Sequence, residues 1–273
     1  MDVVITLLFH SLWPAYLALG LFAGFLAGLL GIGGGAVMVP ILAMIFAAQG
    51  LPQEHLMHLA LGTSMAVIIF TAISSIRAHH ARGGVIWPVV RDITPGILLG
   101  TFAGSLIVSH IPTRELSWFF AGLVCLIALQ MALNLKPKAS RGLPGRAGLI
   151  ATGSGIGCVS ALAAIGGGAM TMPFLTFCNV RVQQAIGTSA AVGLPIALSG
   201  TLGYLWNGSH AEGLPPGSYG YVYLPALFWV TTTSMLAAPW GAKLAHKLPV
   251  ATLKRLFALV LVSLAVKLIS SLS

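Results

Sequence analysis

The sequence predicts an all-α membrane protein built from two related halves. Of its 273 residues, 57% are hydrophobic and only 7% are charged, and the mean hydropathy is +0.95. Soluble globular proteins carry about 25% charged residues, so this chain has too few charges to cover a water-facing surface. Its apolar runs are long and continuous, whereas a membrane β-barrel would show short alternating segments. A motif that occurs twice indicates the two halves.

Ten apolar runs, bounded by charged residues, proline or polar clusters, are the expected membrane segments. A helix needs about 20 apolar residues to span a bilayer, so ten such segments use most of the chain. In the first half they cover residues 12–31, 36–49, 56–77, 93–110 and 115–135. In the second half they cover residues 147–164, 169–179, 184–206, 221–245 and 251–270.

The two halves share three motifs in the same order. The pairs are Ile32–Pro40 with Ile165–Pro173, Leu61–Ser64 with Ile186–Ser189, and Gly104 and Pro112 with Gly241 and Pro249. Because the order is kept, we interpret the chain as a tandem duplication. Residues 1–135 form an N-terminal membrane repeat and residues 147–273 a C-terminal one. The basic stretch 136–146 joins them as a linker that we expect to be cytoplasmic.

The distribution of basic residues predicts the orientation. If each half crosses the membrane five times, 12 of the 14 Lys and Arg residues fall on the side of the linker. Basic residues favour the cytoplasmic side, so both termini are expected outside the cytoplasm, on the periplasmic side. An odd number of crossings makes the two repeats inverted, as in many transporters.

Two of the segments are too short for an ordinary span. Residues 169–179 cover only about 16 Å as a helix, and residues 36–49 little more. Segments of this length more often form re-entrant elements. We therefore favour re-entrant helical hairpins, 12–49 and 147–179, each broken by its glycines. The alternative is that both short segments cross, and the parity of the crossings is the same either way.

The doubled glycine motif predicts a substrate site. Irregular backbone at membrane depth is tolerated where it is buried in protein or lines a cavity. Each glycine run precedes a short helix, whose free N–H groups and partial positive charge suit an anion. The Thr-Ser pairs that follow lie in the first turns of the next segments and can donate hydrogen bonds. The candidate substrate-binding residues are Gly33, Gly34, Gly35, Thr63, Ser64, Gly166, Gly167, Gly168, Thr188 and Ser189.

Packing is the alternative explanation for small and hydroxyl residues. Gly20, Gly24 and Gly28 are four apart, as are Gly100 and Gly104, and this spacing is typical of closely packed membrane helices. We interpret those five as packing residues and the two triple-glycine runs as functional. The Thr-Ser hydroxyls can equally bond back to their own helix, and the sequence leaves that choice open.

Charge and residue types exclude several function classes. The predicted mid-span positions hold no Asp, Glu, Lys or Arg, which argues against a metal or Na⁺ transporter that uses carboxylates and suits an anion or a neutral solute. His55 and His58 alone do not make a metal site. We expect no catalytic residue, no metal and no cofactor. The net charge of +9 lies in short gaps between apolar runs, which indicates membrane lipid rather than nucleic acid as the partner, and a homodimer is possible.

The motifs resemble those of a known family. Gly28–Gly35 with Pro40, followed by Gly62-Thr63-Ser64, and the second copies of both are similar to the TauE/SafE family (DUF81 or TSUP) of sulfite and organosulfonate exporters. The resemblance covers nearly the whole chain. It implies a carrier of the bacterial inner membrane for a small sulfur-containing anion or carboxylate. The second copy has Ala163-Ala164 where the first has Leu30-Gly31, so the halves are not equivalent.

Three functions are compatible with these observations. The leading hypothesis is a secondary transporter that exports a small sulfur-containing anion by exposing a midplane site alternately to the two sides. A channel for an anion or a small neutral solute is the second. A membrane scaffold subunit without transport activity is the third. The membrane potential itself favours anion exit, and the coupling is left open.

Overall fold

The computed structural model describes residues 12–31, 33–133, 142–245 and 250–272. Residues 136–141 of the predicted linker, Ile32 and Pro249 of the repeated motifs, and both extreme termini lie outside the described residues. Of the predicted domain boundaries, the linker's last residues, 142–146, lead directly into the first helix of the second half.

Within the described residues, ten α-helices correspond to the ten predicted segments. The first half contains α2 (Trp13–Leu30), α3 (Gly35–Ala48), α4 (Leu56–His80), α5 (Trp87–Val108) and α6 (Thr113–Ala132), with a short 3₁₀ helix, η1 (Gln53–His55), before α4. The second half contains α7 (Arg146–Ala163), α8 (Gly168–Phe177), α9 (Val182–Gly208), α10 (Leu224–Ala245) and α11 (Val250–Leu272). The prediction of an all-α membrane protein is therefore confirmed at the level of its helices.

Two local features differ from the prediction. Helix α5 begins at Trp87 rather than at residue 93. Pro88 lies in the first turn, where a helix accepts proline. Arg91 and Asp92 do not end the helix, because they pair with each other (Nε to Oδ1, 3.1 Å). A two-stranded antiparallel hairpin, β1 (Ser218–Tyr219) and β2 (Val222–Tyr223), precedes α10 and takes up the start of the predicted segment 221–245.

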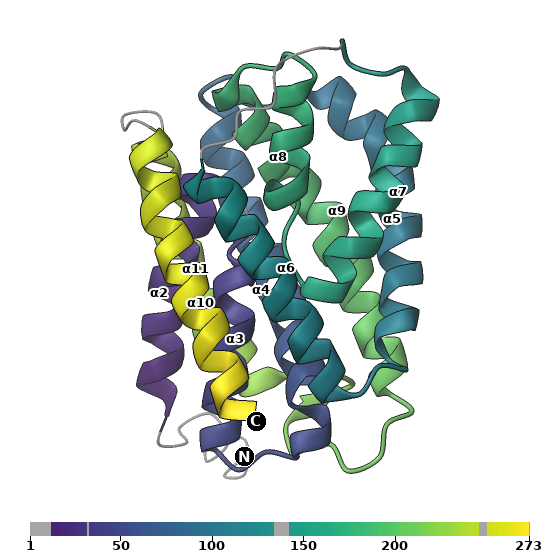
Figure 1. Cartoon of the computed structure of the whole chain (residues 1–273), viewed down its shortest axis with the longest axis vertical. Helices are drawn as coiled ribbons and strands as arrows, with labels where there is room; N and C mark the ends of the chain where they lie inside the picture. Colours follow the sequence, from purple (N-terminus) through teal and green to yellow (C-terminus); the bar gives the residue numbers. More distant parts are fainter. Residues whose placement is uncertain (1–11, 32, 134–141, 246–249, 273) are drawn as a thin grey trace.

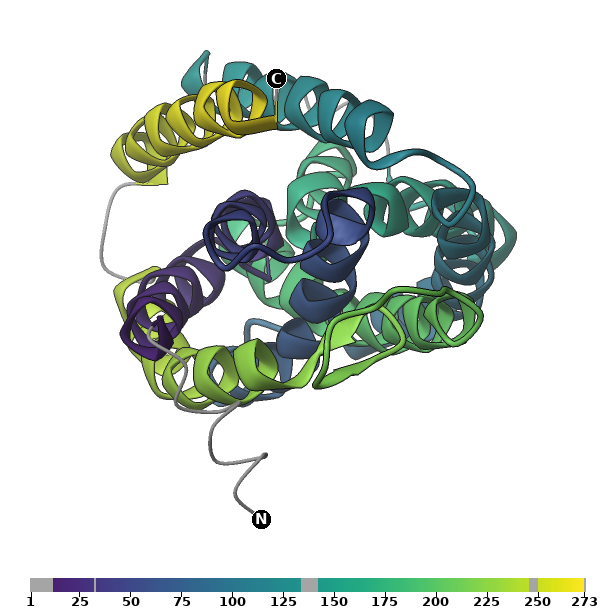
Figure 2. The ribbon, with the colours of Figure 1, turned by 90° about the horizontal axis from the view of Figure 1, so that it is seen from below.

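Helices α4 and α9 occupy the centre of the bundle. In their most apolar windows, 72% and 78% of the residues are buried inside the protein, against 39% for α6 and for α7. Viewed along the long axis, α4 lies inside a ring of other helices, and α6 and α11 lie beside each other along one edge (Figure 2). The motif Gly-Thr-Ser thus lies in the central helix of each half.

The helices of the two halves pack on one another reciprocally. Helix α2 packs mainly against α10 of the other half, and α7 packs mainly against α5. The short helices follow the same scheme, since α3 packs on α4 and α8 packs on α9. The two short helices extend toward opposite ends of the molecule, α8 upward and α3 downward in Figure 1.

Glycines allow the closest of these helix contacts. An added Cβ on Gly24 of α2 would lie 2.5 Å from the Ser234 Cα of α10, and one on Gly104 of α5 would lie 2.6 Å from the Cys158 carbonyl oxygen of α7. Gly20, Gly28 and Gly100 face the same partner helices equally closely. The packing interpretation of these five glycines is confirmed, because each contacts another helix of the same chain.

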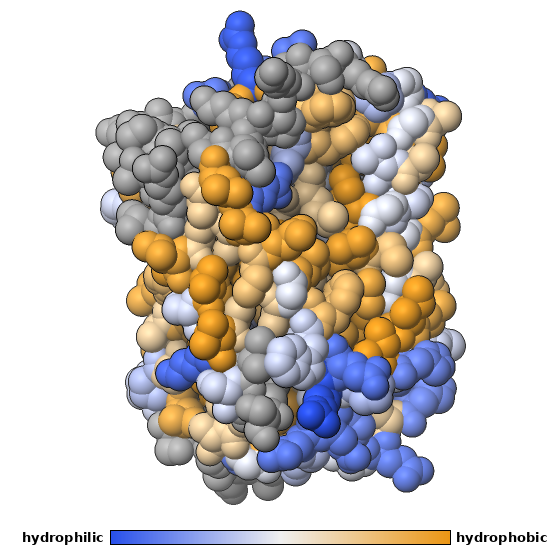
Figure 3. Space-filling model, in the orientation of Figure 1, coloured by the Kyte–Doolittle hydropathy of each residue, from blue (hydrophilic) through white to orange (hydrophobic). Residues whose placement is uncertain are grey.

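The outer surface is apolar over a broad belt. Large side chains such as Leu99, Leu236, Trp240 and Leu259 are between 66% and 71% exposed. In the view of Figure 3 the hydrophobic residues form a band between two more polar ends. Four of the described helices, α6, α7, α9 and α4 extended by η1, are long and apolar enough to cross a membrane by length and composition. An exposed surface of this kind fits a multi-pass membrane protein.

Two glycines of α7 test the packing directly. Gly153→Ala should lower the thermal unfolding midpoint in detergent, because its Cβ would meet Ile93 O at 2.6 Å and Ile97 N at 3.2 Å. Gly155→Ala is the matched control, since its Cβ would meet nothing within 4 Å. Alanine is better than glycine by about 1 kcal/mol in a helix, so the control should hold or raise the midpoint. Equal midpoints for both variants would contradict the packing.

Candidate functional site

The first glycine turn reverses the chain between α2 and α3. Gly31 ends α2 in the left-handed conformation, with φ +66°, and its N–H donates to Ala27 O at 2.9 Å. Gly33 and Gly34 follow with φ of +75° and +79°. Residues with a side chain rarely adopt such angles. The turn therefore depends on glycine at these positions.

The second turn uses a different backbone path. Ala164, which holds the place of Gly31, is also left-handed, with φ +44°, an uncommon conformation for alanine. Gly167 is right-handed, with φ −46° and ψ −21°, whereas its counterpart Gly34 is left-handed. The structure thus confirms that the halves are not equivalent at the turns.

The two turns meet. A Cβ added to Gly33 would lie 2.9 Å from the Gly166 Cα, and one added to Gly35 would overlap the Ala164 carbonyl oxygen. Gly167 packs on α9, where an added Cβ would lie 2.9 Å from Ser189 O. The glycine triplets therefore form one contact region in the middle of the fold.

Helices α2 and α7 end inside the protein, where their last carbonyls need partners. His79 Nε2 lies 3.1 Å from Gly28 O, and because a carbonyl only accepts, this nitrogen must carry the hydrogen. The Tyr204 hydroxyl donates to Ala161 O at 2.8 Å. His79 and Tyr204 occupy equivalent places, each sixteen residues after the threonine of the Gly-Thr-Ser motif. Each thus satisfies a carbonyl that the helix itself leaves open.

The two threonines of the motif fix the start of a helix in the other half. Thr63 Oγ1 accepts from Tyr223 N at 2.9 Å, directly before α10. Thr188 Oγ1 accepts from Ile86 N at 3.0 Å, directly before α5. Neither hydroxyl bonds back to its own helix in these contacts. Each threonine oxygen therefore has a structural role.

The neighbouring serines are different. Ser64 and Ser189 are both fully buried, at 0% exposure. Neither hydroxyl has a hydrogen-bond partner among the described residues. Buried polar groups nearly always have a partner, so two unpartnered hydroxyls at equivalent places call for a physical explanation. A bound substrate or water would supply one.

The structure does not gather all ten predicted residues around one point. Gly187 packs against Gly84, whose N–H donates to His79 O, so Thr188 lies near the end of α4. Thr63 lies sixteen residues before His79, about 24 Å along the helix. One Thr-Ser pair therefore lies on each side of the glycine contact region, and one small ion cannot touch both at once.

Charged groups lie away from the glycine contact region in the part of the chain that the structure describes. Arg91 pairs with Asp92 at the start of α5. His55 Nε2 and His58 Nε2 each bond a backbone carbonyl, those of Glu212 and Val108, at 2.9 Å and 3.2 Å. The turns themselves therefore offer hydroxyl groups and backbone dipoles rather than ionised side chains.

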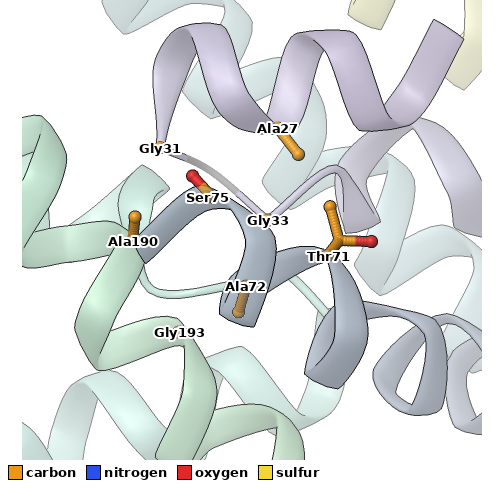
Figure 4. A pocket seen from close by; sticks show the side chains of 8 residues that line it. All are labelled: Ala27, Gly31, Gly33, Thr71, Ala72, Ser75, Ala190 and Gly193. Atoms are coloured by element: carbon orange, nitrogen blue, oxygen red, sulfur yellow. The ribbon is translucent and has the colours of Figure 1, made fainter. Parts of the chain in front are cut away.

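A cavity lies beside the first turn. Its volume is about 10 Å³, which is room for about one water molecule. It is lined by Ala27, Gly31, Gly33, Thr71, Ala72, Ser75, Ala190 and Gly193 (Figure 4). Of the predicted site residues, only Gly33 is among them. Ser189 is the chain neighbour of Ala190, so the cavity lies on the α9 side of the glycine contact region.

Sequence reasoning missed four functional candidates. Thr71 and Ser75 line the cavity, and His79 and Tyr204 bond the ends of the hairpin helices. The equal spacing of His79 and Tyr204 from their threonines was a usable signal. Ser75 had none, because its counterpart in the second half is Gly200.

Comparison with known proteins agrees with the motifs. The family model described as "Sulfite exporter TauE/SafE" matches residues 16–268. The chain belongs to the TauE/SafE family. A Haemophilus influenzae protein named "Probable membrane transporter protein" is 39% identical over 92% of this chain and 96% of its own length. A Methanocaldococcus jannaschii relative with the same kind of name is 30% identical over 88% and 89% of the two chains. No solved structure matches this chain.

Membership of the TauE/SafE family places the chain among membrane transporters rather than enzymes. A third relative, from Bacillus subtilis, is also named a "Probable membrane transporter protein" and is 26% identical over 85% of this chain. The apolar helices and exposed apolar belt agree with a membrane transporter.

Tyr204 tests the helix-end bonds. Tyr204→Phe should destabilise the protein by about 1–3 kcal/mol, because it leaves the buried Ala161 carbonyl without a partner. Tyr219→Phe is the control, since Tyr219 is 70% exposed and such changes stay within about 0.5 kcal/mol. Unfolding in mixed micelles with rising SDS measures both. Equal stabilities would mean that the Tyr204 hydroxyl does not support the end of α7.

Proposed function

We propose that this TauE/SafE protein is a secondary transporter that exports a small sulfur-containing anion, such as sulfite or a sulfonate, by alternating access. The observation that carries the proposal is the pair of buried, unpartnered hydroxyls of Ser64 and Ser189 on the two sides of the meeting glycine turns. The family description supports sulfite as the first substrate to test.

A site made of uncharged hydrogen-bond donors suits an anion that must be released after it binds. Helices α3 and α8 begin at Gly35 and Gly168, beside the glycine contact region, and the first N–H groups of a helix have no intrahelical partner. These N–H groups and the partial positive charge of the helix start favour a negative ligand. The serine hydroxyls add donors without a buried charge. Such a site binds an anion less tightly than a buried lysine or arginine would.

The hairpin arrangement is part of the proposal. The Tyr16 hydroxyl, near the start of α2, donates to Gln49 Oε1, just after α3, at 2.8 Å. The two limbs of this hairpin therefore begin and end at the same end of the molecule, which supports a re-entrant hairpin. We extend the same form to α7 and α8, and with it an inverted arrangement of the two repeats.

Orientation follows from the charges. Arg77 lies in the last turn of α4, Arg82 lies in the turn that follows, and Arg181 directly precedes α9. We place this end in the cytoplasm of a bacterial inner membrane, which puts both termini on the periplasmic side. Ser189 then lies on the inner side of the turns and Ser64 on the outer side. In alternating access the anion contacts the inner serine first and the outer serine before release.

Loss of either serine should impair export. Ser64→Ala and Ser189→Ala should each lower saturable sulfite efflux from proteoliposomes by about ten- to hundredfold, because a hydrogen bond to a charged group contributes about 1.5–3 kcal/mol. Ser263→Ala is the matched control, since its exposed hydroxyl donates to Val260 O within α11. Gly34→Leu and Gly167→Leu should abolish efflux while the protein still inserts.

The same assay separates the other functions. Efflux that rises linearly with concentration and does not saturate would indicate a channel. No efflux from correctly inserted protein with any anion would favour a scaffold subunit. Unchanged saturable efflux in both serine variants and both glycine variants would contradict the proposed site.

A further inference from the structure

The loop before α10 is held on α4 by the first Gly-Thr pair. An added Cβ on Gly62 would overlap Tyr221 O, so the two backbones are in contact there. One residue on, Thr63 Oγ1 accepts a hydrogen bond from Tyr223 N at 2.9 Å. The β1–β2 hairpin of this loop lies against α4 in the view from below (Figure 2). A loop of the second half thus covers the N-terminal part of α4, which carries the first Thr-Ser pair.

The loop before α5 is held on α9 by the second Gly-Thr pair. An added Cβ on Gly187 would overlap Gly84 O. Thr188 Oγ1 accepts a hydrogen bond from Ile86 N at 3.0 Å. In both loops the N–H that is bonded belongs to the second residue after the carbonyl that is contacted. A loop of the first half therefore covers the N-terminal part of α9 by the same two contacts.

Each loop also packs on the short helix of the opposite half. The Tyr223 ring meets the Phe46 ring of α3 edge to face, with 5.4 Å between the ring centroids. Ile86 packs against a buried apolar cluster that includes Met172 and Leu175 of α8. Each loop therefore joins a central helix and a short helix of the repeat to which it does not belong.

Both Thr-Ser pairs are closed off from water in this structure. Thr63, Ser64, Thr188 and Ser189 are all 0% exposed. A solute from either side of the membrane can reach one of the serines only after the cover over that serine has moved. The two loops are covers of this kind, because each is bonded to the residue directly before a serine.

The two threonine bonds are suited to repeated opening. Tyr223 N and Ile86 N lie directly before α10 and α5, in the region of a helix start where N–H groups need an outside partner. When such a loop lifts toward water, its N–H group can bond water instead. The net loss is that of one neutral hydrogen bond, which is small. The bond therefore closes the site without closing it permanently.

We propose that Thr63 and Thr188 are the positioning residues of two gates, each of which holds a loop of the opposite repeat over the adjacent serine. Residues 221–223 on Gly62-Thr63 form the outer gate, and residues 84–86 on Gly187-Thr188 form the inner gate. Release of one bond at a time opens the site to one side. The inference rests on the proposed alternating access and specifies the parts that move, and it requires no particular substrate.

The accessibility of single thiols in the full chain tests the gates. Ser64→Cys and Ser189→Cys are introduced separately into a chain that carries Cys125→Ala, Cys158→Ala and Cys178→Ala. A membrane-impermeant methanethiosulfonate reagent is added to right-side-out or inside-out membrane vesicles, and the rate of modification is measured. With both threonines present, each thiol should react slowly, because both serine positions are buried.

Removal of one threonine hydroxyl should open one gate. Thr63→Val keeps the shape of the side chain but removes the acceptor. It should raise the modification rate of the Ser64→Cys thiol from outside by about three- to tenfold, the change in an opening equilibrium on loss of one neutral hydrogen bond. The Ser189→Cys thiol should keep its rate. Thr188→Val should have the reverse effect, with the faster reaction from the cytoplasmic side.

Two controls separate a gate from general loosening of the fold. Thr63→Ser and Thr188→Ser keep the accepting oxygen and should leave both rates near those of the parent chain. Thr232→Val is the matched control, since the exposed Thr232 hydroxyl donates to Phe228 O within α10 at 2.8 Å. It should change neither rate.

The outcomes separate the gates from the proposed function. Faster modification of both thiols in each valine variant would show general loosening and would overturn the gates. Unchanged rates in both valine variants would overturn them too, because the loops would then be permanent covers. If each valine variant exposes only its own thiol but no sulfur anion is transported, the gates stand and the proposed substrate fails.

Discussion

The backbone at the glycine turns is the constraint on which the rest of the structure depends. Helices α2, α3, α7 and α8 end or begin inside the protein, where no bulk water can satisfy open N–H and C=O groups. The chain meets this constraint with side chains from the two central helices. His79 bonds Gly28 O, and Tyr204 bonds Ala161 O. The central position of α4 and α9 follows, because they must reach both hairpins.

The same constraint explains why the proposed site is neutral. Open N–H groups at the starts of α3 and α8 already provide partial positive charge, so an anion needs no buried lysine or arginine there. Hydroxyl groups complete the donors. Ser64 and Ser189 have no hydrogen-bond partner among the described residues, whereas Thr63 and Thr188 hold the starts of α10 and α5. In the proposed function, adjacent residues of one motif therefore divide structure and binding between them.

The two halves correspond in their main helix contacts but differ in the side chains around the glycine turns. Helix α2 packs on α10 as α7 packs on α5, but Gly200 stands in the place of Ser75, and Met65 and Ile68 stand in the places of Ala190 and Gly193. A few side chains therefore suffice to make a nearly symmetric frame unequal on its two sides. The left-handed Ala164 in place of Gly31 adds a further difference at the turn itself.

Much of the fold could be predicted from the sequence, because apolar runs and repeated motifs act locally. All ten segments correspond to helices, and Gly24 and Gly104 pack as their spacing indicates. The sequence places the start of this segment at residue 93, because the charged residues Arg91 and Asp92 resemble the end of an apolar run. In the structure these two residues pair with each other inside α5. The separation of Thr63 from Thr188 could not be predicted, since it depends on how far each hairpin extends into the bundle. Ser75 could not be found either, because a lone serine has no pattern and its burial is set by α2 and α9.

Equilibrium binding of radiolabelled sulfite to the purified protein tests the central claim most directly. The account predicts saturable binding that unlabelled sulfite displaces, because the starts of α3 and α8 and the hydroxyls of Ser64 and Ser189 provide donors for an anion. The absence of saturable binding by well-folded protein would contradict the anion site itself.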